Sequence, residues 1–352
     1  MDDGKVQKAL AGDEGWIVGG AVRDELLGRP VLDVDVACRT PREAAHRYAS
    51  LFGGAVFSLS ERHGAWRVAS GSEETVDFTP LPDGIDEDLA TRDFTFNAIA
   101  VAVGSAVYRD PFDGREDLRA GVIRAVSESV FEDDPLRLLR AVRLEDELGF
   151  RMDERTEALL RVSAGLATRP AGERVLSELV RLSPEGYERL AELGLLEPLG
   201  GSLDGSIAGT GEEGSSLQLV TWKAGYLLTA VFGAGLDRLP ISNELRRYAT
   251  TLLRSEPPPD DSARAIHRFR KATEPWALDA LAFVGRPELA ERVQEARRNE
   301  PTEPLVRGDE LGLPPGPEIG RILAIIDEER AVGTISTRAE ALDLARTLGG
   351  KA

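Results

Sequence analysis

Two aspartates separated by one residue, Asp33 and Asp35, are the side chains of this sequence best placed to do chemistry. They lie in an alternating run, Val31 to Ala37, in which side chains two positions apart point to the same face of a strand. Two adjacent carboxylates repel each other unless a cation or protons neutralise them, and hard oxygen ligands suit Mg²⁺ held jointly with substrate phosphates. The pair indicates a magnesium site, although two acids on a solvent-facing edge strand would show the same pattern.

A third acid, Asp77, lies in a second alternating run, Thr75 to Thr79. The alternation places Val76 and Phe78 toward the core and Asp77 outward. Three carboxylates from two strands could bind two Mg²⁺ ions for in-line nucleotidyl transfer. We therefore expect Asp77 to assist the first pair.

A glycine-rich turn precedes the aspartate pair, with the sequence Gly19-Gly20-Ala21-Val22-Arg23-Asp24. It joins a predicted strand to a predicted helix, so free backbone N–H groups and the positive helix end could hold a triphosphate, with Arg23 adding a fixed positive charge. The segment is neither a Walker A loop nor a G-x-G-x-x-G fingerprint. The alternative, that the glycines only make a tight turn, stays open.

The elements that must position these residues change in character along the chain. Strands are predicted at 16–18, 31–37, 75–79, 99–103 and 122–126, with a helix at 21–27. Amphipathic helices are predicted from Pro135 onward and at 173–182, 217–232 and 319–329, and a loop or linker at 201–216. This order predicts an α+β protein with a mixed α/β region first and helices after it.

The composition is that of a soluble globular protein. The chain has 352 residues, of which 42% are hydrophobic and 30% charged. It has no apolar run of the roughly 18 residues that a membrane helix needs and no signal-peptide pattern, so we expect a cytoplasmic protein without a membrane partner. The only cysteine is Cys38, and three histidines leave little material for a zinc cluster.

The charge of the chain is strongly acidic, with a net value of −18, which argues against broad, non-specific binding to a polyanion. One stretch differs: residues 245–271 carry seven basic and three acidic residues, a net charge of +4. This stretch is a candidate phosphate-contacting surface. A solvated helix face would have the same composition.

Taken together, the chain resembles the class II tRNA nucleotidyltransferase and bacterial poly(A) polymerase family, within the polymerase β-like nucleotidyltransferases. Five ordered segments carry the resemblance: GGAVRDELLGRPVLDVDVA (19–37), TRDFTFNAIA (91–100), DPFDGREDL (110–118), DDPLRLLRAVR (133–143) and ERVLSELVRL (173–182). The first segment implies metal binding by Asp33 and Asp35 and triphosphate contacts near Gly19, Gly20 and Arg23. The second implies recognition of ribose or phosphate by Arg92 and Asp93, with a structural role for Asn97.

The fourth segment has two interpretations. From the residues alone, Pro135 fits the first position of a helix, Asp134 its N-cap, and Asp133 and Arg137 an i,i+4 ion pair. The resemblance implies instead that Asp134 and Arg137 bind the Watson–Crick edge of the incoming nucleotide, while Asp133 orients Arg137. It also implies that Arg140, one turn further on, meets phosphate.

Three departures from the family pattern bear on specificity. Family members often have Glu in place of Asp133, and their second motif commonly begins with paired arginines where this chain has Thr91. Only 14 residues separate Asp77 from Arg92, whereas many CCA-adding members have a longer flexible loop there that is associated with switching from CTP to ATP. The short segment raises the possibility of an enzyme that adds only CC.

The resemblance covers most of the chain and implies four regions. These are a nucleotidyltransferase head (1–125), a helical neck that selects the base (126–185), a helical body that binds RNA (186–300) and a helical tail (301–352). The basic stretch of the body would contact tRNA backbone through Arg264, Arg268, Arg270 and Lys271.

The expected reaction is attack of the tRNA 3′-hydroxyl on the α-phosphate of CTP or ATP, with Mg²⁺ bound by Asp33 and Asp35 and with help from Asp77. A poly(A) polymerase, which extends RNA 3′ ends with ATP, shares the same motifs and is the nearest alternative. A catalytically silent RNA-binding protein that keeps the fold is an alternative of another class, and the intact aspartate pair speaks against it.

Overall fold

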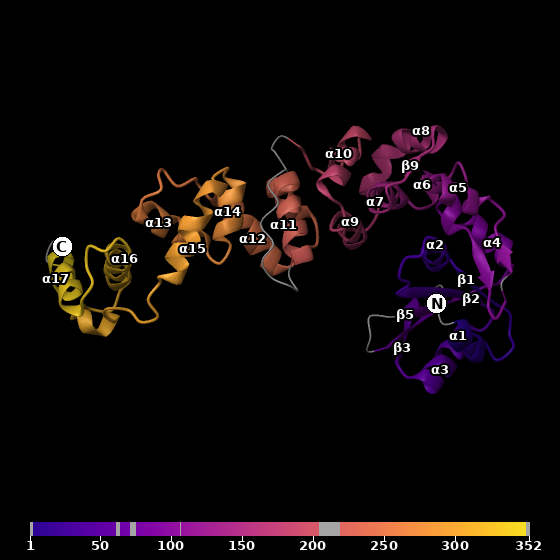
Figure 1. Ribbon diagram of the computed structural model, residues 1–352, viewed down its shortest axis with the longest axis horizontal. Coiled ribbons are helices and arrows are strands. Elements are labelled where there is room, and N and C mark those ends of the chain that lie inside the picture. The colour runs from indigo at the N-terminus through magenta and orange to yellow at the C-terminus, as the bar shows by residue number, and fades with distance from the viewer. Residues whose placement is uncertain (1–2, 61–63, 71–74, 106, 204–218, 350–352) are drawn as a thin grey trace. The chain divides into compact units, whose positions relative to one another are not determined.

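The computed structural model describes residues 3–60, 64–70, 75–105, 107–203 and 219–349, and the side chains of 219–222 lie outside this description. The chain forms two compact units, Met1–Gly200 and Gly201–Ala352, which we describe separately. Most of the predicted loop at 201–216 lies outside the described residues. Figure 1 shows strands confined to the first unit and helices throughout the second, so the predicted α+β fold is confirmed.

The first unit contains a seven-stranded sheet in the order β3-β4-β5-β2-β1-β6-β7. Its central strand β2 is antiparallel to β1 and parallel to β5, and Asp35 pairs with Asp77 in the parallel register. The strands are β1 (Gly15–Val18), β2 (Asp33–Cys38), β3 (Ala55–Ser60), β4 (Ala65–Ala69), β5 (Thr75–Pro80), β6 (Ala100–Ala102) and β7 (Tyr108–Arg109).

The two faces of this sheet are covered to different extents. The alternating apolar residues of β2 and β5, among them Val36 and Phe78, pack under α1 (Asp3–Leu10) and α3 (Pro41–Phe52). Helix α2 (Gly20–Leu26) packs beside Ile17 on the same face. On the other face, α4 (Ile85–Ala90) covers β1 and the end of β2 around Val18 and Ala37. That face also carries the aspartates.

The sequence pattern predicted the four inner strands β5, β2, β1 and β6 but not the strands toward the two edges of the sheet. The runs at 16–18, 31–37, 75–79 and 99–103 form β1, β2, β5 and β6, as predicted. Strands β3, β4 and β7 were not predicted. The predicted strand at 122–126 does not extend this sheet: its first two residues form β8 (Val122–Ile123), which pairs with β9 (Arg151–Met152) in a separate two-stranded sheet.

Helices complete the first unit. The helix predicted from Pro135 onward is α7, and its buried side includes Leu138, Leu139, Val142 and Leu144. The helix predicted at 173–182 is α9. The α-helices of this part of the first unit are α5 (Gly114–Ala120), α6 (Val130–Asp133), α7 (Arg137–Leu148), α8 (Glu154–Ser163), α9 (Gly172–Leu179) and α10 (Pro184–Glu192).

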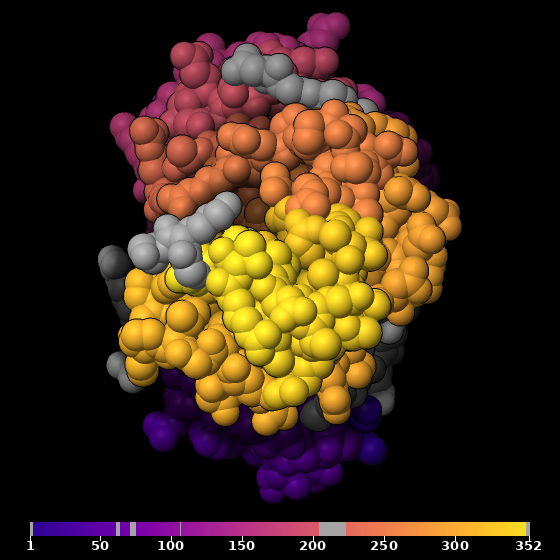
Figure 2. Space-filling model, turned by 90° about the vertical axis from the view of Figure 1, so that its left-hand side faces the viewer, coloured from indigo at the N-terminus to yellow at the C-terminus, as the bar shows by residue number. Residues whose placement is uncertain are grey.

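The second unit is helical and has two apolar cores. One lies around Tyr248, Leu252 and Ile266, and the other lies around Ile322 and Ile326 near the C-terminal end, which is yellow in Figure 2. The helices are α11 (Leu219–Phe232), α12 (Asn243–Arg254), α13 (Ala263–Thr273), α14 (Ala277–Phe283), α15 (Ala290–Arg298), α16 (Pro317–Ala331) and α17 (Arg338–Gly349). None of the described helices has the length and apolar character that crossing a bilayer requires. The division into head, neck, body and tail stays a prediction.

Candidate active site

The two predicted metal ligands lie on one face of β2, as the alternation predicts. Asp33 is exposed, and its Oδ1 accepts a hydrogen bond of 2.6 Å from Thr75 Oγ1 on β5. Asp35 is half-buried and lies opposite Asp77. The strand register therefore aligns three carboxylates from two adjacent strands.

Asp35 has the electrostatic character of a cation ligand. Burial raises the pKa of its carboxyl, and the negative charges of Asp77 and Asp33 raise it further, while Arg92 lowers it. The net result is an upward shift, so the surrounding protein supplies too little positive charge for the ionised form. A divalent cation would provide that charge, and the donor set fits one.

Asp77 is held by the protein itself. Arg67 on β4 donates from Nε and Nη2 to the two carboxylate oxygens of Asp77, each at 2.7 Å. Asp77 faces away from Val76 and Phe78, as the alternation predicts, but Arg67 covers it, so it is only 9% exposed. In the described part of the chain, no group of three or more His, Cys, Asp or Glu side chains is arranged to hold a metal ion. A cation at Asp33 and Asp35 would therefore need further ligands from a substrate.

A cavity of about 320 Å³ lies beside Asp35. It gathers residues from the glycine turn, from the segment after β5 and from the start of α7, which lie far apart in the sequence. Its lining consists of Gly19, Gly20, Asp35, Asp88, Thr91, Arg92, Asp93, Asn97, Asp134, Arg137 and Arg140. Most of the predicted nucleotide-binding residues therefore share one cavity.

The glycine turn opens the cavity on the side of β1. Gly19 has a φ of +70°, which L-residues with a side chain rarely adopt, and α2 begins at Gly20. A Cβ at Gly19 would lie 3.4 Å from Arg92 Nη1 and 3.5 Å from Asp35 Oδ2. These are ordinary contact distances, so the positive φ, and not a lack of space, is what favours glycine at this position.

Arg23 does not line the cavity. Its side chain is buried, and it donates to both carboxylate oxygens of Asp24 at 2.9 Å and to Asn97 Oδ1 at 3.0 Å. Asp24 and Asn97 fix the guanidinium in place, and its predicted contact with a triphosphate stays a prediction. Arg23 supports the turn through Asn97.

The second motif connects that turn to α7. Asp93 accepts from Asn97 Nδ2 at 2.9 Å through Oδ1, and from Arg140 Nη1 at 3.2 Å through Oδ2. Arg92 is held by Asp88, which accepts from its Nε and Nη2 at 3.1 and 2.7 Å. Asn97 lies between Arg23 and Asp93, which agrees with the structural role that the resemblance implies.

In the fourth motif, the structure supports the capping role of Asp134 but not the predicted contact between Asp133 and Arg137. Asp134 Oδ1 accepts from the backbone N–H of Leu136 at 3.2 Å, so it caps the turn that leads into α7. Asp133 does not contact Arg137; it accepts from Ser129 Oγ at 2.8 Å. The predicted ion pair is absent because α6 ends at Asp133 and Asp134 is extended, so these residues are not on one continuous helix.

Arg137 is instead oriented by backbone carbonyls. Its Nη2 donates to Thr91 O at 2.6 Å and its Nη1 to Val130 O at 3.3 Å. The family often has an arginine at the position of Thr91. In this chain the backbone carbonyl of that residue contributes to the site by accepting from Arg137. The hypothesis that Asp133 orients Arg137 by direct pairing is wrong.

Two residues of the fifth motif, Arg174 and Glu178, support the site although they were not singled out in the sequence. Arg174 donates to Asp134 at 2.7 and 3.3 Å, and Glu178 is buried against Arg143 and Arg140. Burial alone would raise the pKa of Asp134, but the hydrogen bonds from Arg174 and from Leu136 N–H bring it below its usual value. The i,i+4 spacing of Arg174 and Glu178, which places both on one face of a helix, was the sequence feature that could have pointed to them.

The predicted RNA-binding cations lie on α13 in the second unit, and carboxylates pair with all four. Arg264 and Arg268 contact Glu328 of α16, Arg270 contacts Glu274 and Glu300, and Lys271 contacts Asp327 at 2.7 Å and Glu300 at 3.6 Å. Their local positive charge is thus largely neutralised within the unit.

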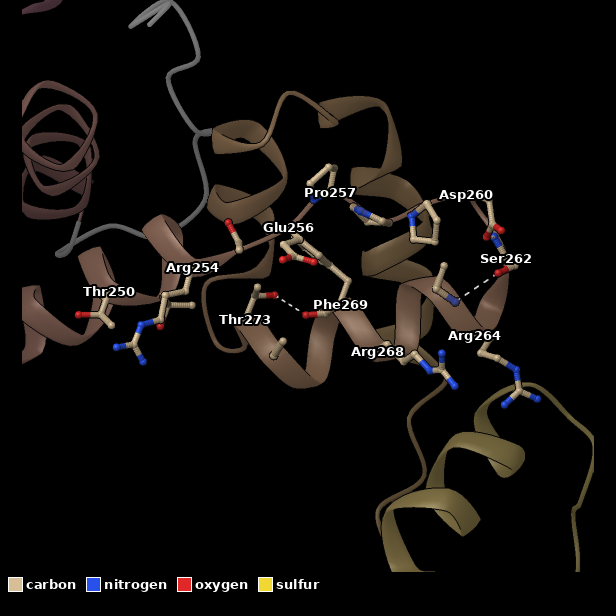
Figure 3. Close-up of a pocket in the computed structure, with 16 residues that line it drawn as sticks. Thr250, Arg254, Glu256, Pro257, Asp260, Ser262, Arg264, Arg268, Phe269 and Thr273 are labelled. Carbon is tan, nitrogen blue, oxygen red and sulfur yellow. Dashed lines mark hydrogen bonds between the residues drawn. The ribbon is translucent and has the colours of Figure 1, made fainter. Parts of the chain in front are cut away.

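A larger cavity, of about 700 Å³, lies between α12, α13 and the turn at Pro257 to Pro259. In Figure 3, Arg264 and Arg268 extend toward α16, and Arg254 extends from α12 elsewhere on the cavity wall. Within the described residues, no carboxylate forms an ion pair with Arg254 or with Arg247 on the same helix. The role of α13 in RNA binding stays a prediction.

The fold and the site define a class of protein. A central strand with alternate carboxylates, a glycine turn beside it and a helical segment that contributes arginines to the same cavity are the architecture of a polymerase β-like nucleotidyltransferase. In agreement, residues 15–82 and 72–124 match the model of the poly A polymerase head domain. Such nucleotidyltransferases generally use divalent metal ions.

Comparison with known proteins narrows the class. The chain is 33% identical to the A-adding tRNA nucleotidyltransferase of Deinococcus radiodurans, over 92% of this chain and 93% of that protein. It is 31% identical to the CC-adding tRNA nucleotidyltransferase of Thermus thermophilus, over 92% and 91%. The protein therefore belongs to the tRNA nucleotidyltransferase family, which confirms the resemblance and makes it an enzyme.

Solved structures agree with this assignment. The CCA-adding enzyme of Bacillus stearothermophilus in complex with CTP superposes with a TM-score of 0.76 at 26% identity, covering 99% of this chain and 98% of that one. The Thermotoga maritima CCA-adding enzyme, in a complex with tRNA, gives a TM-score of 0.74 at 22% identity over 97% and 93%, and it supports the fold.

Proposed function

We propose that this protein adds C, A or both to the 3′ end of tRNA. The oxygen of the terminal 3′-hydroxyl attacks the α-phosphorus of CTP or ATP, the bond from that phosphorus to the bridging oxygen breaks, pyrophosphate leaves, and the hydroxyl proton passes to solvent. The cavity that joins Asp35 and the glycine turn to Asp134 and Arg137 is the observation that carries this proposal. It combines a cation-binding carboxylate with polar groups suited to a nucleotide.

The residues of the head would hold the reacting phosphates. Mg²⁺ bound by Asp33 and Asp35 would lower the pKa of the attacking hydroxyl and neutralise charge on the phosphoryl group. The N–H groups at Gly19 and Gly20 and the guanidinium of Arg92 line the side of the cavity next to Asp35, where they would bind the triphosphate. Asp93 and Arg140, which line the cavity as a pair, would contact ribose or phosphate.

The residues of α7 and the turn before it would select the base. Arg137 offers hydrogen-bond donors and Asp134 an acceptor, the combination that a Watson–Crick edge requires. Each is held by an independent contact: Arg137 by the Thr91 carbonyl and Asp134 by Arg174. Side chains fixed before the nucleotide arrives lose little freedom on binding, which favours discrimination.

Two observations favour a single-specificity enzyme that adds only CC or only A. The segment between Asp77 and Arg92 holds just the end of β5 and the short helix α4, with no room for a long loop. Two relatives that are more than 30% identical over nine-tenths of both chains are named as A-adding and CC-adding enzymes, whereas another, 29% identical over similar shares, is named a CCA-adding enzyme. A single-specificity protein would complete the CCA end together with a second enzyme, in the cytoplasm.

The experiment uses three tRNAs, which lack the whole CCA end, its last two nucleotides or only the final A. Each is incubated with the full chain, MgCl₂ and CTP or ATP, and the products are resolved to single nucleotides. Addition of C alone or of A alone supports the single-specificity proposal, and addition of all three nucleotides identifies a CCA-adding enzyme. Long ATP-dependent tails on unrelated RNA would identify a poly(A) polymerase. No addition to any RNA would overturn the proposed function.

A further inference from the structure

One row of side chains crosses the open face of the sheet from the carboxylates to its edge. Asp35 on β2 pairs with Asp77 on β5, Asp77 with Arg67 on β4, and Arg67 with Phe57 on β3. Residues in register on neighbouring strands point to the same face. Phe57 therefore lies on the face that carries the metal-binding pair.

The end of this row is apolar and exposed. Phe57, the last residue of the row, is 44% exposed. The neighbours of Phe57 on the opposite face behave differently, since Val56 packs with Val68 against the core under α3. The exposed ring of Phe57 is therefore available to bind a ligand on the face that carries the aspartates.

The geometry of the reaction assigns that part of the face to the acceptor strand. The nucleotide cavity lies on the β1 side of β2, since its lining comes from Gly19, α4 and α7. An in-line displacement places the attacking hydroxyl opposite the leaving pyrophosphate. Helix α4 covers β1 and the end of β2 on this face. The surface over β5, β4 and β3 is thus the side that is left for the RNA that carries the hydroxyl.

The distance suits the last few nucleotides of that RNA. Neighbouring strands are about 4.8 Å apart, so Phe57, three strands from Asp35, lies roughly 14 Å away across the sheet. Single-stranded nucleic acid is commonly bound by aromatic side chains on which successive bases stack. Arg67, with its side chain one-third exposed, lies between the two positions and would border the backbone.

We propose that Phe57 is a stacking platform for bases at the 3′ end of the acceptor RNA. The inference rests on the proposed function, because it takes the 3′-hydroxyl to react at Asp35. Phe57 acts as a positioning residue: it holds the upstream bases so that the terminal hydroxyl reaches the carboxylates. Its effect should therefore fall on the RNA and not on the nucleoside triphosphate.

The test compares Phe57→Ala with a matched control, Phe52→Ala. Phe52 is 36% exposed, but it lies at the end of α3 on the other side of the sheet, where its ring contacts Tyr48 at 5.1 Å between centroids. Two further variants separate stacking from simple apolar contact: Phe57→Trp keeps an aromatic face, and Phe57→Leu does not. Thermal denaturation of each variant checks that the fold is intact.

Binding is measured first without turnover, by fluorescence anisotropy of a labelled tRNA lacking its CCA end, in EDTA. Steady-state addition in MgCl₂ then gives KM for the tRNA and for the triphosphate. We expect Phe57→Ala to raise both Kd and KM for tRNA by about fivefold or more, as the removal of one stacked base predicts. KM for CTP or ATP should change by less than twofold, Phe57→Trp should restore RNA binding, and Phe52→Ala should resemble the wild type.

Three results would overturn the inference. The first is unchanged tRNA affinity in Phe57→Ala. The second is an equal effect of Phe52→Ala. The third is a wild-type dimer, measured by light scattering, that Phe57→Ala converts to a monomer while tRNA affinity stays the same, because the face would then bind a second copy. If the wild-type protein adds no nucleotide to any RNA, the proposed function is wrong. If the wild type is active and Phe57→Ala does not change its affinity for tRNA, only this inference is wrong.

Discussion

Asp93 Oδ2 accepts a hydrogen bond from Arg140 Nη1 at 3.2 Å, which links the segment after α4 to the middle of α7. Asp93 is also held by Asn97, which binds Arg23 below the glycine turn. On the other side, Arg140 Nε lies 3.6 Å from Glu178 of α9. A continuous chain of polar side chains therefore runs from the turn beside the carboxylates to α7 and α9.

We predict that Asp93 and Arg140 act as a unit. Asp93→Asn and Arg140→Gln should each lower kcat/KM for the nucleotide, because Arg140→Gln leaves the buried Asp93 carboxylate without its counterion and Asp93→Asn removes one of the two carboxylates that hold Arg140. The double variant should lose less than the sum, with an interaction energy of about 0.5–3 kcal/mol in a double-mutant cycle. Strictly additive losses would show that the two residues act independently.

The aspartate pair should be essential. Asp33→Ala and Asp35→Ala are expected to abolish nucleotide addition in MgCl₂ with the fold intact, as judged by circular dichroism. Asp77→Ala should reduce turnover to a smaller extent, because Arg67 already neutralises its charge. Unchanged turnover in either of the first two variants contradicts the metal assignment.

The carboxylate of Asp35 should also lower the stability of the folded protein when no cation is bound. Burial and neighbouring carboxylates raise its pKa, so the ionised form is disfavoured in the folded state near neutral pH. Asp35→Asn is therefore expected to raise the melting temperature in EDTA, even though it removes activity. MgCl₂ should stabilise the wild type more than this variant, which scanning calorimetry in both buffers measures. A lower melting temperature of Asp35→Asn in EDTA would contradict this account.

Arg137 should decide which base is accepted. Arg137→Ala is expected to lower the preference for CTP and ATP over GTP and UTP, by about 1–3 kcal/mol for each hydrogen bond to the base that it removes. Relative kcat/KM values for the four triphosphates measure this preference. If Arg137→Ala leaves the preference intact and only lowers thermal stability, the residue serves to pin α7 to Val130 and Thr91.

The contact between α13 and α16 should depend on pH. Hydrogen bonds from Arg268 and then from Arg264 lower the pKa of Glu328 to about 2, from a usual value of 4.5. A lowered folded-state pKa means that the stabilisation is fully present above about pH 4.5 and is lost as pH falls toward 2. Glu328→Gln should therefore melt at a lower temperature than the wild type at pH 7, and the difference should shrink from pH 4.5 downward. A constant difference across that range would exclude Glu328 as its source.

The cations that bind RNA should be distinguishable by their salt dependence. Arg264 and Arg268 must leave Glu328 before they bind phosphate, whereas Arg247 and Arg254 on α12 have no carboxylate to leave in the described part of the chain. Arg247→Gln with Arg254→Gln should make the slope of log affinity against log salt shallower by about 0.7–0.9 for each phosphate that the variant no longer binds. Arg264→Gln with Arg268→Gln should do so less. The reverse order would support the assignment made from the sequence.

The sequence predicted the parts of the site that depend on local periodicity. Asp33 and Asp35 share a face because strand alternation requires it, and the glycine turn follows from Gly19 and Gly20 between an apolar run and a helix. The register of β2 against β5, which aligns Asp35 with Asp77, agrees with the expectation that these acids meet.

Local periodicity could not predict the contacts between segments that lie far apart in the sequence. Arg67 covers Asp77 from a strand that was not predicted, and Arg174 reaches Asp134 across 40 positions. The Asp133–Arg137 pair failed for a local reason, since its spacing requires an unbroken helix and the backbone is extended at Asp134. Ion pairs of this kind depend on tertiary packing, which no spacing rule contains.

The carbonyl of Thr91 that binds Arg137 has a consequence for how substitutions are interpreted at this position. The atom that matters belongs to the main chain, so every amino acid supplies it, provided that the backbone keeps its path. Proline is the exception, because the N–H of residue 91 also donates to Asp88 O at 3.1 Å. Tolerance of many side chains at position 91 would then conceal a contact on which base selection depends, and a scan that only exchanges side chains would overlook it.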